Sequence, residues 1–372
     1  MKAFINGKII LENQILDNKV LIFDSTIISI KDAAPKGCKI IDVEGNYISP
    51  GFIDIHIHGF KGYDVMDSSL ESLENISKEI IKTGVTRYLA TTMTMKLSKI
   101  IDSLEVIKVA INKNNYKGAK IMGAYLEGPF ISKEYKGAQS EKYIRKPSWK
   151  DIDKYNDIIK IITLAVEEDD NFDFIKNNPG INLSIGHSNA NYETALIAYK
   201  MGVKHCTHCF NAMTGLHHRK PGIVGACFSK KYETEFIADK IHINPAFLET
   251  FINIIGVDQG IIITDSIRAG GMEEGVYELG GQEVYVDKTS ARLKSGVLAG
   301  SILTMDKAIK NINELTKLPL YDIIKMATLN PAKSIDKDSN YGVIEIGKLS
   351  DFVILNKNLD VVSTWIEGEK IF

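Results

Sequence analysis

The sequence has no long hydrophobic run. No window of its 372 residues approaches the roughly 18 consecutive apolar residues that a membrane-spanning helix needs. The first residues, Met1–Lys8, also lack the apolar stretch and the small-residue cleavage site of a secretory signal peptide. We therefore expect no membrane partner and no export signal.

Cysteine is scarce. The four cysteines, Cys38, Cys206, Cys209 and Cys227, are too few and too scattered for a disulfide scaffold, which favours a reducing cytoplasm. Cys206 and Cys209 have the CxxC spacing of a zinc-ligand pair, but the sequence has no second pair to complete a structural zinc site. We interpret them as small apolar residues at the end of a strand.

An excess of charge of one sign is also absent. The chain has 45 Lys and Arg against 47 Asp and Glu, a net charge of -2, and no cluster of basic residues. This balance argues against nucleic acid or an anionic membrane surface as a partner. With 44% hydrophobic and 25% charged residues, the composition is typical of a soluble globular protein and is compatible with a small-molecule substrate.

Between residues 50 and 339, apolar strand-like runs alternate with helix-like segments. The predicted strands are Phe52–His58, Val85–Thr92, Ile121–Glu127, Ile159–Val166, Ile181–His187, Val203–His208, Phe236–Ala238 and Ile261–Asp265. The predicted helices are Leu70–Lys82, Leu97–Asn114, Asp169–Asn177, Asn191–Met201 and Pro245–Ile255. Eight strands alternating with helices are typical of a parallel (β/α)8 barrel, which uses about 250 residues. The sequence therefore predicts an α/β fold with a TIM-like catalytic barrel over residues 50–339.

Both chain ends differ from the middle and consist of short strand-like runs. Asn6-Gly7 is a strong signal for a two-residue hairpin turn between Ala3–Ile5 and Ile9–Leu11. Further strand-like runs are Val20–Phe23, Thr26–Ile30, Asp351–Leu355 and Val361–Trp365. We therefore predict that residues 1–49 and 340–372 together form one small β domain.

Histidine, the commonest metal-ligating side chain, recurs at the ends of the predicted strands. In Phe52–His58 the period of two puts Asp54, His56 and His58 on one face of the strand. The two histidines are then ~6.6 Å apart along the strand and can reach the same metal centre. The alternative is a solvated outer face, but a strand of a parallel barrel has no solvated face.

Three further residues of ligand type stand at the ends of apolar strands. Glu127, His187 and His208 each end a predicted strand. Taken singly, Glu127 could be a surface residue or a helix cap, and His187 or His208 could be a hydrogen-bonded core histidine. Barrel enzymes keep their catalytic groups at the C-terminal ends of the strands, so we predict that all three meet the histidine pair of the first strand at one metal centre.

Two more positions suggest roles in catalysis and binding. Asp265 ends the last predicted strand, which a barrel places beside the first, and this is the position for a general base; the alternative is an N-cap of the following segment. The long connection from Cys209 to Glu235 is rich in Gly, His and basic residues, and loops of this length are functional or disordered. Its Arg219 could fork onto a phosphate or a carboxylate, or could simply be solvated.

Taken together, these motifs resemble the amidohydrolase superfamily and, within it, the N-acetylglucosamine-6-phosphate deacetylase family. The matching stretches run in family order over nearly the whole chain: Pro50–Gly59, Leu126–Phe130, Gly186–Asn189, Thr207–Met213, Arg219–Gly222, Ala238–His242, Thr264–Ser266 and Leu298–Gly300. Leu126–Phe130 and Thr207–Met213 separate this resemblance from hydantoinase- and urease-like relatives, which use a carboxylated lysine where this family uses the glutamate.

The resemblance implies roles for individual residues. Glu127, His187 and His208 become the core metal ligands, and Asp265 becomes the general acid and base. The implied substrate contacts are Ala138, Gln139, Asn211, Ala212, Arg219, Asp239, His242, Leu298, Ala299 and Gly300. The chain ends become an accessory β-sandwich, and the protein becomes a homodimer in which residues of the Arg219 loop reach the active site of a neighbour.

Two features that vary within the family bear on this chain. Members that keep both histidines of the first-strand pair hold two metals, so His56 and His58 imply two divalent ions bridged by Glu127. These would be Zn or Fe, with Mn or Co as alternatives. Other members have a histidine where this chain has Gln139. An amide is neither charged nor a proton donor in the manner of an imidazole, so the acid or electrophile role of that histidine does not carry over to Gln139, whose role the sequence leaves open.

The resemblance implies deacetylation of N-acetyl-D-glucosamine 6-phosphate to D-glucosamine 6-phosphate and acetate, a reaction of amino-sugar metabolism. In that reaction Asp265 accepts a proton from a metal-activated water and passes it to the leaving amine. One alternative is another amidohydrolase, acting on an N-acyl amino acid or a cyclic amide. A second is a non-catalytic, metal-binding barrel. Against the second, the sequence contains Asp265 and all of the expected ligands.

Overall fold

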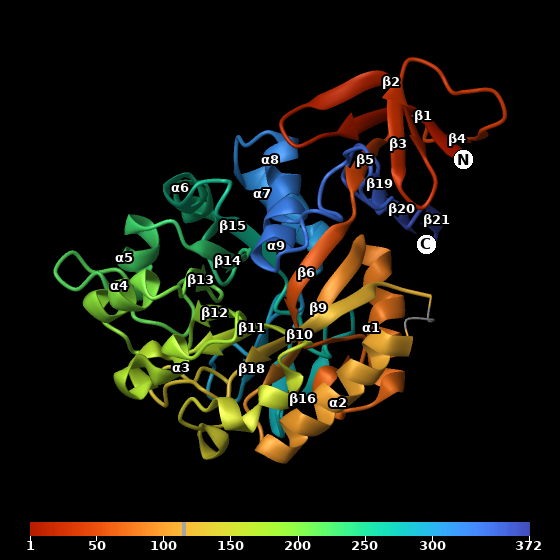
Figure 1. Ribbon diagram of the computed structural model, residues 1–372. Helices are drawn as coiled ribbons and strands as arrows, with labels where there is room; N and C mark the ends of the chain where they lie inside the picture. The colour runs from red at the N-terminus through yellow and green to blue at the C-terminus, as the bar shows by residue number, and fades with distance from the viewer. Residues whose placement is uncertain (114–116) are drawn as a thin grey trace.

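The centre of the molecule is a nearly closed barrel of eight parallel strands (Figure 1). The computed structural model describes residues 1–113 and 117–372. In spatial order the strands are β6 (Phe52–Ile57), β9 (Val85–Met93), β10 (Lys120–Glu127), β11 (Ile159–Leu164), β12 (Asn182–Ile185), β13 (His205–Cys206), β14 (Glu233–Ile237) and β15 (Gly260–Ile263). Beyond β15, Asp265 N–H donates to the His56 carbonyl over 2.9 Å, and Ser266 pairs with Ile57 in parallel. This contact brings the last strand end to the first, and the predicted (β/α)8 barrel is confirmed.

The barrel strands are buried on both faces. All six residues of β6 and all nine of β9 are buried, because helices cover the outside and side chains of other strands fill the inside. The apolar runs of the sequence therefore locate the strands well. β9 and β10 are each one residue longer than predicted, and β11, β12 and β13 are shorter. The largest extension is in β14, which begins at Glu233, not at Phe236. Its extra residues include Thr234 and Glu235, polar side chains that the barrel buries completely.

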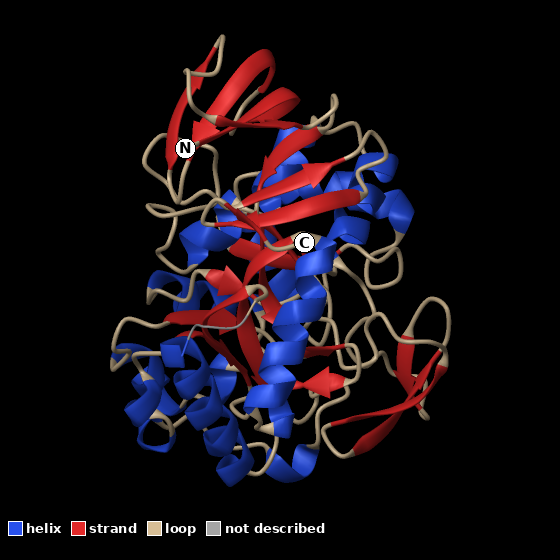
Figure 2. Cartoon of the chain, turned by 90° about the vertical axis from the view of Figure 1, so that its right-hand side faces the viewer, coloured by secondary structure: helices blue, strands red, loops and turns tan. Residues whose placement is uncertain are grey.

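Helices surround the barrel, as the blue ribbons around the central strands in Figure 2 show. The predicted helices are present as α1 (Leu70–Ile80), α2 (Leu97–Lys113), α3 (Asp173–Lys176), α4 (Tyr192–Lys200) and α6 (Pro245–Ile255). Asn114, the last residue of one predicted helix, lies outside the described residues. Later helices are α7 (Met305–Leu315), α8 (Leu320–Met326) and α9 (Leu329–Ser334). Short 3₁₀ turns are η1 (Val65–Asp67), η2 (Ile81–Thr83), η3 (Glu141–Tyr143), η4 (Trp149–Asp151), η5 (Asp153–Tyr155), η6 (Val166–Glu168) and η7 (Asp170–Phe172).

The long connection between Cys209 and Glu235 contains a helix that the sequence pattern did not reveal. This helix, α5, runs over Gly222–Ser229. Every residue from Gly222 to Cys227 is buried, so the segment has no polar face and lacks the amphipathic spacing by which helices are recognised. The part of the connection before α5 remains a loop and carries Arg219.

The two chain ends join in one mixed eight-stranded sheet, which Figure 1 shows in red and dark blue at the top of the view. Its strands are β1 (Lys2–Ile10), β2 (Ile15–Phe23), β3 (Ile27–Lys31), β4 (Lys39–Asp42), β5 (Tyr47–Pro50), β19 (Phe352–Leu355), β20 (Val361–Ile366) and β21 (Glu369–Lys370). β5 pairs with β1 on one side and with β19 on the other, which connects the two ends. The sheet has an aromatic core in which the ring centroids of Phe4 and Trp365 are 5.0 Å apart.

The predicted hairpin turn at Asn6-Gly7 is wrong. β1 runs without interruption from Lys2 to Ile10 and pairs with β2 along its length. Asn6 does adopt a left-handed φ of 56°, but the pairing shifts register between Phe4 and Gly7, so the dipeptide forms a bulge within the strand. The local turn preference of Asn-Gly is satisfied without a chain reversal, because the tertiary pairing with β2 fixes the strand direction.

After β15 the chain adds a small antiparallel sheet that was not predicted. It consists of β16 (Gly275–Leu279), β17 (Gln282–Val286) and β18 (Ala291–Leu293). The Gln282 side-chain amide donates to the Ala138 carbonyl over 2.6 Å, which ties this sheet to the loop after β10. A two-stranded ribbon, β7 (Gly59–Phe60) with β8 (Tyr63–Asp64), follows β6.

Among the described residues, no helix has both the length and the apolar character that a bilayer span requires.

Candidate metal centre and active site

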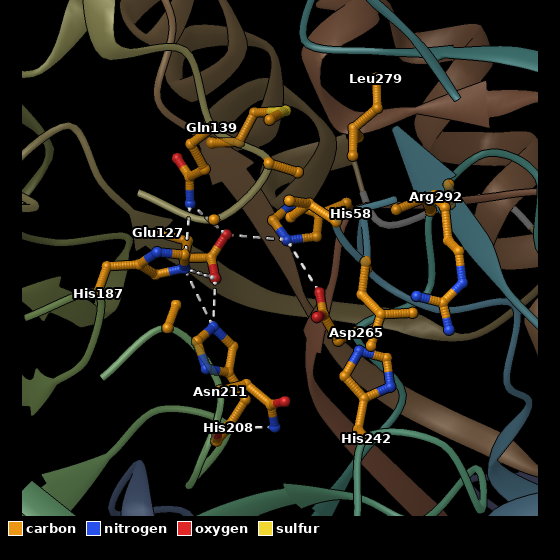
Figure 3. Close-up of a pocket in the computed structure, with 18 residues that line it drawn as sticks. His58, Glu127, Gln139, His187, His208, Asn211, His242, Asp265, Leu279 and Arg292 are labelled. Atoms are coloured by element: carbon orange, nitrogen blue, oxygen red, sulfur yellow. Dashed lines mark hydrogen bonds and ion pairs between the residues drawn. The ribbon is translucent and has the colours of Figure 1, made fainter. Parts of the chain in front are cut away.

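A cavity of about 350 Å³ opens at the C-terminal ends of the barrel strands (Figure 3). Its lining combines strand-end residues with residues of the small β16–β18 sheet. The expected site residues with titratable or amide side chains that line it include His58, Glu127, Gln139, His187, His208, His242 and Asp265. Asn211, Ala212, Ala138, Leu298 and Gly300 also line it. Most of the sequence motifs therefore meet at this cavity, and the Arg219 motif does not.

Four imidazoles converge on the carboxylate of Glu127. The Nε2 atoms of His187 and His208 lie 3.0 and 2.9 Å from Glu127 Oε1. The Nε2 atom of His58 lies 3.2 Å from Oε2, and that of His56 lies 3.5 Å from Oε1. All five side chains are buried. Figure 3 shows His58 and His187 reaching Glu127 from opposite sides.

The opposite ring nitrogens of three imidazoles meet hydrogen-bond acceptors. His58 Nδ1 lies 3.2 Å from the Thr91 carbonyl, and His187 Nδ1 lies 2.8 Å from the Tyr135 carbonyl. His56 Nδ1 lies 3.0 Å from a carboxylate oxygen of Glu235. In a neutral ring whose Nδ1–H donates to such an acceptor, Nε2 carries no hydrogen and presents its lone pair. This is the tautomer that can bind a metal through Nε2.

Asp265 stands beside the histidine pair of β6. Its Oδ1 atom lies 3.2 Å from His58 Nε2 and 3.6 Å from His56 Nε2. The ligand atoms of these three residues all lie within 4.8 Å of one another, as do those of Glu127, His187 and His208. The predicted ligands thus form two adjacent groups, and Asp265 belongs to the first.

The donor set fits divalent metal ions. His56 Nε2 is buried and has no hydrogen-bond partner among the described residues, although it points toward two carboxylates. A buried nitrogen without a partner is costly, and a metal ion would satisfy it. Imidazole and carboxylate ligands at this density suit Zn, Fe, Mn or Co.

The carboxylates of the site are ionised. Burial alone would raise the pKa of Glu127, but the imidazoles of His187 and His208 hold that pKa well below its ordinary value. Burial would likewise raise the pKa of Asp265, but a hydrogen bond from His58, when its ring is protonated on both nitrogens, lowers it. At neutral pH both groups therefore carry a negative charge, so Glu127 can bind a cation and Asp265 can accept a proton.

Strained backbone marks the same strand ends. His187, His208 and Asp265 have φ angles of 45°, 29° and 48°, in the left-handed region that side-chain-bearing residues rarely adopt. Each of these residues follows directly or closely on a barrel strand. Such strain persists only where the surrounding structure enforces it, and all three of these residues line the cavity.

Some of the expected substrate-binding residues line the cavity and others do not. His242 lines the cavity, and its Nδ1 lies 2.7 Å from Asp239, which therefore supports the imidazole without lining the cavity itself. Ala299 is buried behind Leu298 and Gly300. Arg219 does not line the cavity of its own chain; it is exposed in the loop before α5, with Nη1 2.8 Å from His218 Nε2.

Gln139 contacts the metal-ligand group directly. Its amide nitrogen donates to Glu127 Oε2 over 2.8 Å, and its amide oxygen accepts from the Thr94 N–H over 2.7 Å. Both ends of the amide are thereby fixed. In this arrangement Gln139 holds the Glu127 carboxylate in place.

Sequence reasoning missed two residues of this region. Glu235 was overlooked because the predicted strand began one residue after it. Arg292 was overlooked because the segment that forms β16–β18 was assigned no structure. Arg292 lines the cavity and is half-buried, with Nε donating to Ser290 Oγ and Nη1 to the Gly296 carbonyl.

The cysteines form a cluster that the CxxC spacing alone did not indicate. Cys206, Cys209 and Cys227 are buried and unpaired, and their sulfur atoms lie within 4.8 Å of one another. Cys227 comes from α5 and joins the pair that flanks His208.

A parallel barrel with an imidazole and carboxylate cluster at its C-terminal strand ends has the architecture of a metal-dependent hydrolase. The chain belongs to the amidohydrolase family, whose sequence profile matches residues 47–371.

Within this family, the chain is similar to several amino-sugar-phosphate deacetylases. The N-acetylglucosamine-6-phosphate deacetylase of Bacillus subtilis (strain 168) is 36% identical over 98% of this chain and 95% of its own length. The N-acetylgalactosamine-6-phosphate deacetylase of Escherichia coli O157:H7 is 33% identical over 95% of this chain and 94% of its own length. The crystal structure of N-acetylglucosamine-6-phosphate deacetylase from Pasteurella multocida matches with a TM-score of 0.92, 31% identity and 99% coverage of both chains.

Proposed function

We propose that this chain hydrolyses the acetamide bond of N-acetyl-D-glucosamine 6-phosphate to give D-glucosamine 6-phosphate and acetate. The observation that carries the proposal is the convergence of four imidazoles on Glu127, with Asp265 beside them, in a chain 36% identical to a deacetylase of that name. Free cysteines and a small-molecule substrate are compatible with a cytoplasmic enzyme of amino-sugar metabolism.

The two ligand groups would hold two divalent ions. His56 and His58 would bind one, His187 and His208 the other, and Glu127 would bridge them. When bound, such ions supply a water of lowered pKa and an electrophile for the carbonyl oxygen. Zn and Fe are the proposed metals, with Mn and Co as alternatives that the same ligands accept.

Asp265 would move the proton of the reaction. Because its pKa is lowered, it is ionised before the reaction and can accept a proton from the attacking water. The protonated carboxyl can then donate to the nitrogen of the leaving amine. One residue thus serves as base and then as acid, and its burial keeps bulk water from competing for the proton.

The sugar phosphate would occupy the cavity between the metal centre and the β16–β18 sheet. Asn211 and the main chain of Ala212, Leu298 and Gly300 offer polar groups for the sugar. His242 is held by Asp239 through Nδ1, and an imidazolium ring in this orientation would donate its Nε2–H to an anionic substituent.

Two arginines would serve the phosphate in different ways. Arg292 is the one Lys or Arg among the described residues that line the cavity, and no carboxylate within the described part of the chain pairs with it. It is therefore the cation that a single chain offers to the substrate. Arg219 lies outside its own cavity and would act in a homodimer, reaching the cavity of the neighbouring subunit.

The test is a deacetylation assay on the purified, metal-loaded chain. Release of acetate should be fast with N-acetylglucosamine 6-phosphate and slow with unphosphorylated N-acetylglucosamine. N-acetylgalactosamine 6-phosphate belongs in the panel, because one relative is named for that substrate. N-acyl amino acids represent the alternative amidohydrolase activity. Preferential turnover of an N-acyl amino acid would reject the proposal.

A further inference from the structure

We propose that Glu235 is a positioning residue that fixes the tautomer and orientation of His56 in the metal centre. The inference rests on the proposed metal centre but not on the identity of the substrate. It adds to the site a residue that is neither a predicted ligand nor a lining residue of the cavity.

Glu235 lies on β14, inside the barrel, and its side chain is 0% exposed. Its Oε2 atom lies 3.0 Å from His56 Nδ1 and 3.2 Å from the main-chain nitrogen of His208. Its Oε1 atom lies 3.8 Å from His205 Nε2 and has no hydrogen-bond partner among the described residues. A fully buried carboxylate without a Lys or Arg partner is costly to keep. A functional contact would account for its presence, and the side chain within hydrogen-bond distance of it is that of His56.

The contact decides which nitrogen of His56 carries the proton. An ionised carboxylate accepts hydrogen bonds and donates none, so Glu235 requires the hydrogen of a neutral His56 ring to sit on Nδ1. Nε2 then presents its lone pair. This is the buried Nε2 atom that has no partner and that faces Glu127 and Asp265.

His56 differs in this respect from the other three imidazoles. His58 and His187 are held through Nδ1 by main-chain carbonyls, which any side chain at those positions would also provide. His208 Nδ1 is buried without a hydrogen-bond partner among the described residues. His56 is therefore the imidazole of the site whose orientation depends on another side chain, and that side chain can be changed by substitution.

Glu235 also connects the two ligand groups. The same oxygen that accepts from His56 accepts the N–H of His208, whose φ of 29° is strained. One carboxylate on β14 thus holds an imidazole from β6 and the main chain just after β13. Removal of a partner of this kind costs roughly 10- to 100-fold in metal affinity.

The first test measures metal affinity rather than catalysis. The full-length chain and its Glu235→Gln and Glu235→Ala variants are stripped of metal, reloaded with zinc and titrated against a competing chelator. We expect zinc to bind Glu235→Ala about 10- to 100-fold more weakly than the wild-type chain. The loss in Glu235→Gln should be smaller, because its amide oxygen can still accept from Nδ1. Wild-type affinity in both folded variants would overturn the proposal.

A matched control separates the contact from the chemical change. Glu233→Gln makes the same substitution two residues earlier on β14, where the carboxylate meets the Asn182 amide and no imidazole. Its zinc affinity should equal that of the wild-type chain. A loss in Glu233→Gln as large as in Glu235→Gln would show that the effect belongs to the strand and would reject the assignment.

A double-mutant cycle tests whether Glu235 acts through His56. In a His56→Ala background, adding Glu235→Gln should weaken zinc binding much less than it does in the wild-type background, because the ring that it orients is gone. An equal loss in both backgrounds would indicate a general structural role and would contradict the proposal.

A measurement on the wild-type chain does not depend on any variant folding. In the zinc-loaded protein labelled with ¹⁵N-histidine, His56 should show a hydrogen-bonded, slowly exchanging proton on Nδ1. Its signal is assigned by its absence from His56→Ala. A His56 ring with its proton on Nε2 would refute the proposal, whatever the enzyme turns over.

Discussion

Replacement of Asp265 by asparagine removes the proposed proton carrier and keeps its shape. The wild-type Oδ1 atom lies 3.2 Å from His58 Nε2 in a buried position, so an amide of the same size can occupy the space. The amide cannot accept the proton of the attacking water or return it to the amine. Proton transfer by a positioned side chain contributes ~10²–10⁴-fold, which corresponds to about 2.7–5.4 kcal/mol at 1.36 kcal/mol per tenfold. We expect kcat for Asp265→Asn to fall by a factor in that range.

The assay must separate lost chemistry from lost metal, because Asp265 belongs to the same ligand group as His56 and His58. The metal content of each preparation is therefore measured before acetate release is followed at saturating N-acetylglucosamine 6-phosphate. Asp102→Asn, the same change at an exposed position of α2, is the control and should keep wild-type turnover. Near-normal kcat for a fully metal-loaded Asp265→Asn would refute the role of Asp265 as base and acid.

Three further outcomes follow from the structure. Arg292→Ala and Arg219→Ala should each raise KM for the 6-phosphate substrate and change KM for the unphosphorylated sugar little. For Arg292→Ala the increase should be roughly 10- to 150-fold, because a lost charged hydrogen bond is worth about 1.5–3 kcal/mol. An equal increase in KM for both sugars would indicate that the substituted arginine has a structural role. Chelation of the metal should lower the thermal midpoint, since an ion at 100 times its Kd contributes about 2.7 kcal/mol, and an unchanged midpoint would contradict a buried metal centre. Phe4→Ala, in the core of the chain-end sheet, should cost roughly 3–5 kcal/mol of unfolding free energy by denaturant titration. It should leave kcat unchanged, and a loss of kcat in the folded variant would connect that sheet to catalysis.

The barrel could be predicted from the sequence because its strands are buried on both faces. A run such as Phe52–Ile57 must be apolar on the side of the helices, and its inward positions carry the ligands, so the alternation itself reports the fold and part of the site. The shared location of Glu127, His187 and His208, at or just after the ends of their strands, could be predicted in the same way. A barrel brings all its C-terminal strand ends to one mouth.

Glu235 could not be found by that reasoning. In β14 the residues Glu233, Thr234 and Glu235 look like the polar approach to a strand, because a sequence does not say which polar residues face a barrel interior. Only the closed barrel sets Glu235 against His56, 179 positions away in the chain.

Local signals failed where tertiary pairing overrides them. Asn6-Gly7 has the composition of a hairpin turn, yet pairing with β2 continues on both sides of it, and the dipeptide forms a bulge within β1. The sequence did not predict α5, because the helix is buried on all sides and lacks the polar face by which a helix is recognised. The position of Arg292 at the cavity could not be predicted, because it lies in a small sheet that is held in place by contacts with the loop after β10.

The central claim is that the cluster around Glu127 is a metal centre that deacetylates an amino-sugar phosphate. The most direct measurement is the stoichiometry of products from N-acetylglucosamine 6-phosphate with the metal-loaded chain, its chelated form and the reloaded form. We expect one acetate and one glucosamine 6-phosphate per turnover, loss of activity on chelation and its return on reloading with a divalent ion. Absence of turnover by the fully metal-loaded chain, or full activity of the metal-free chain, would contradict it.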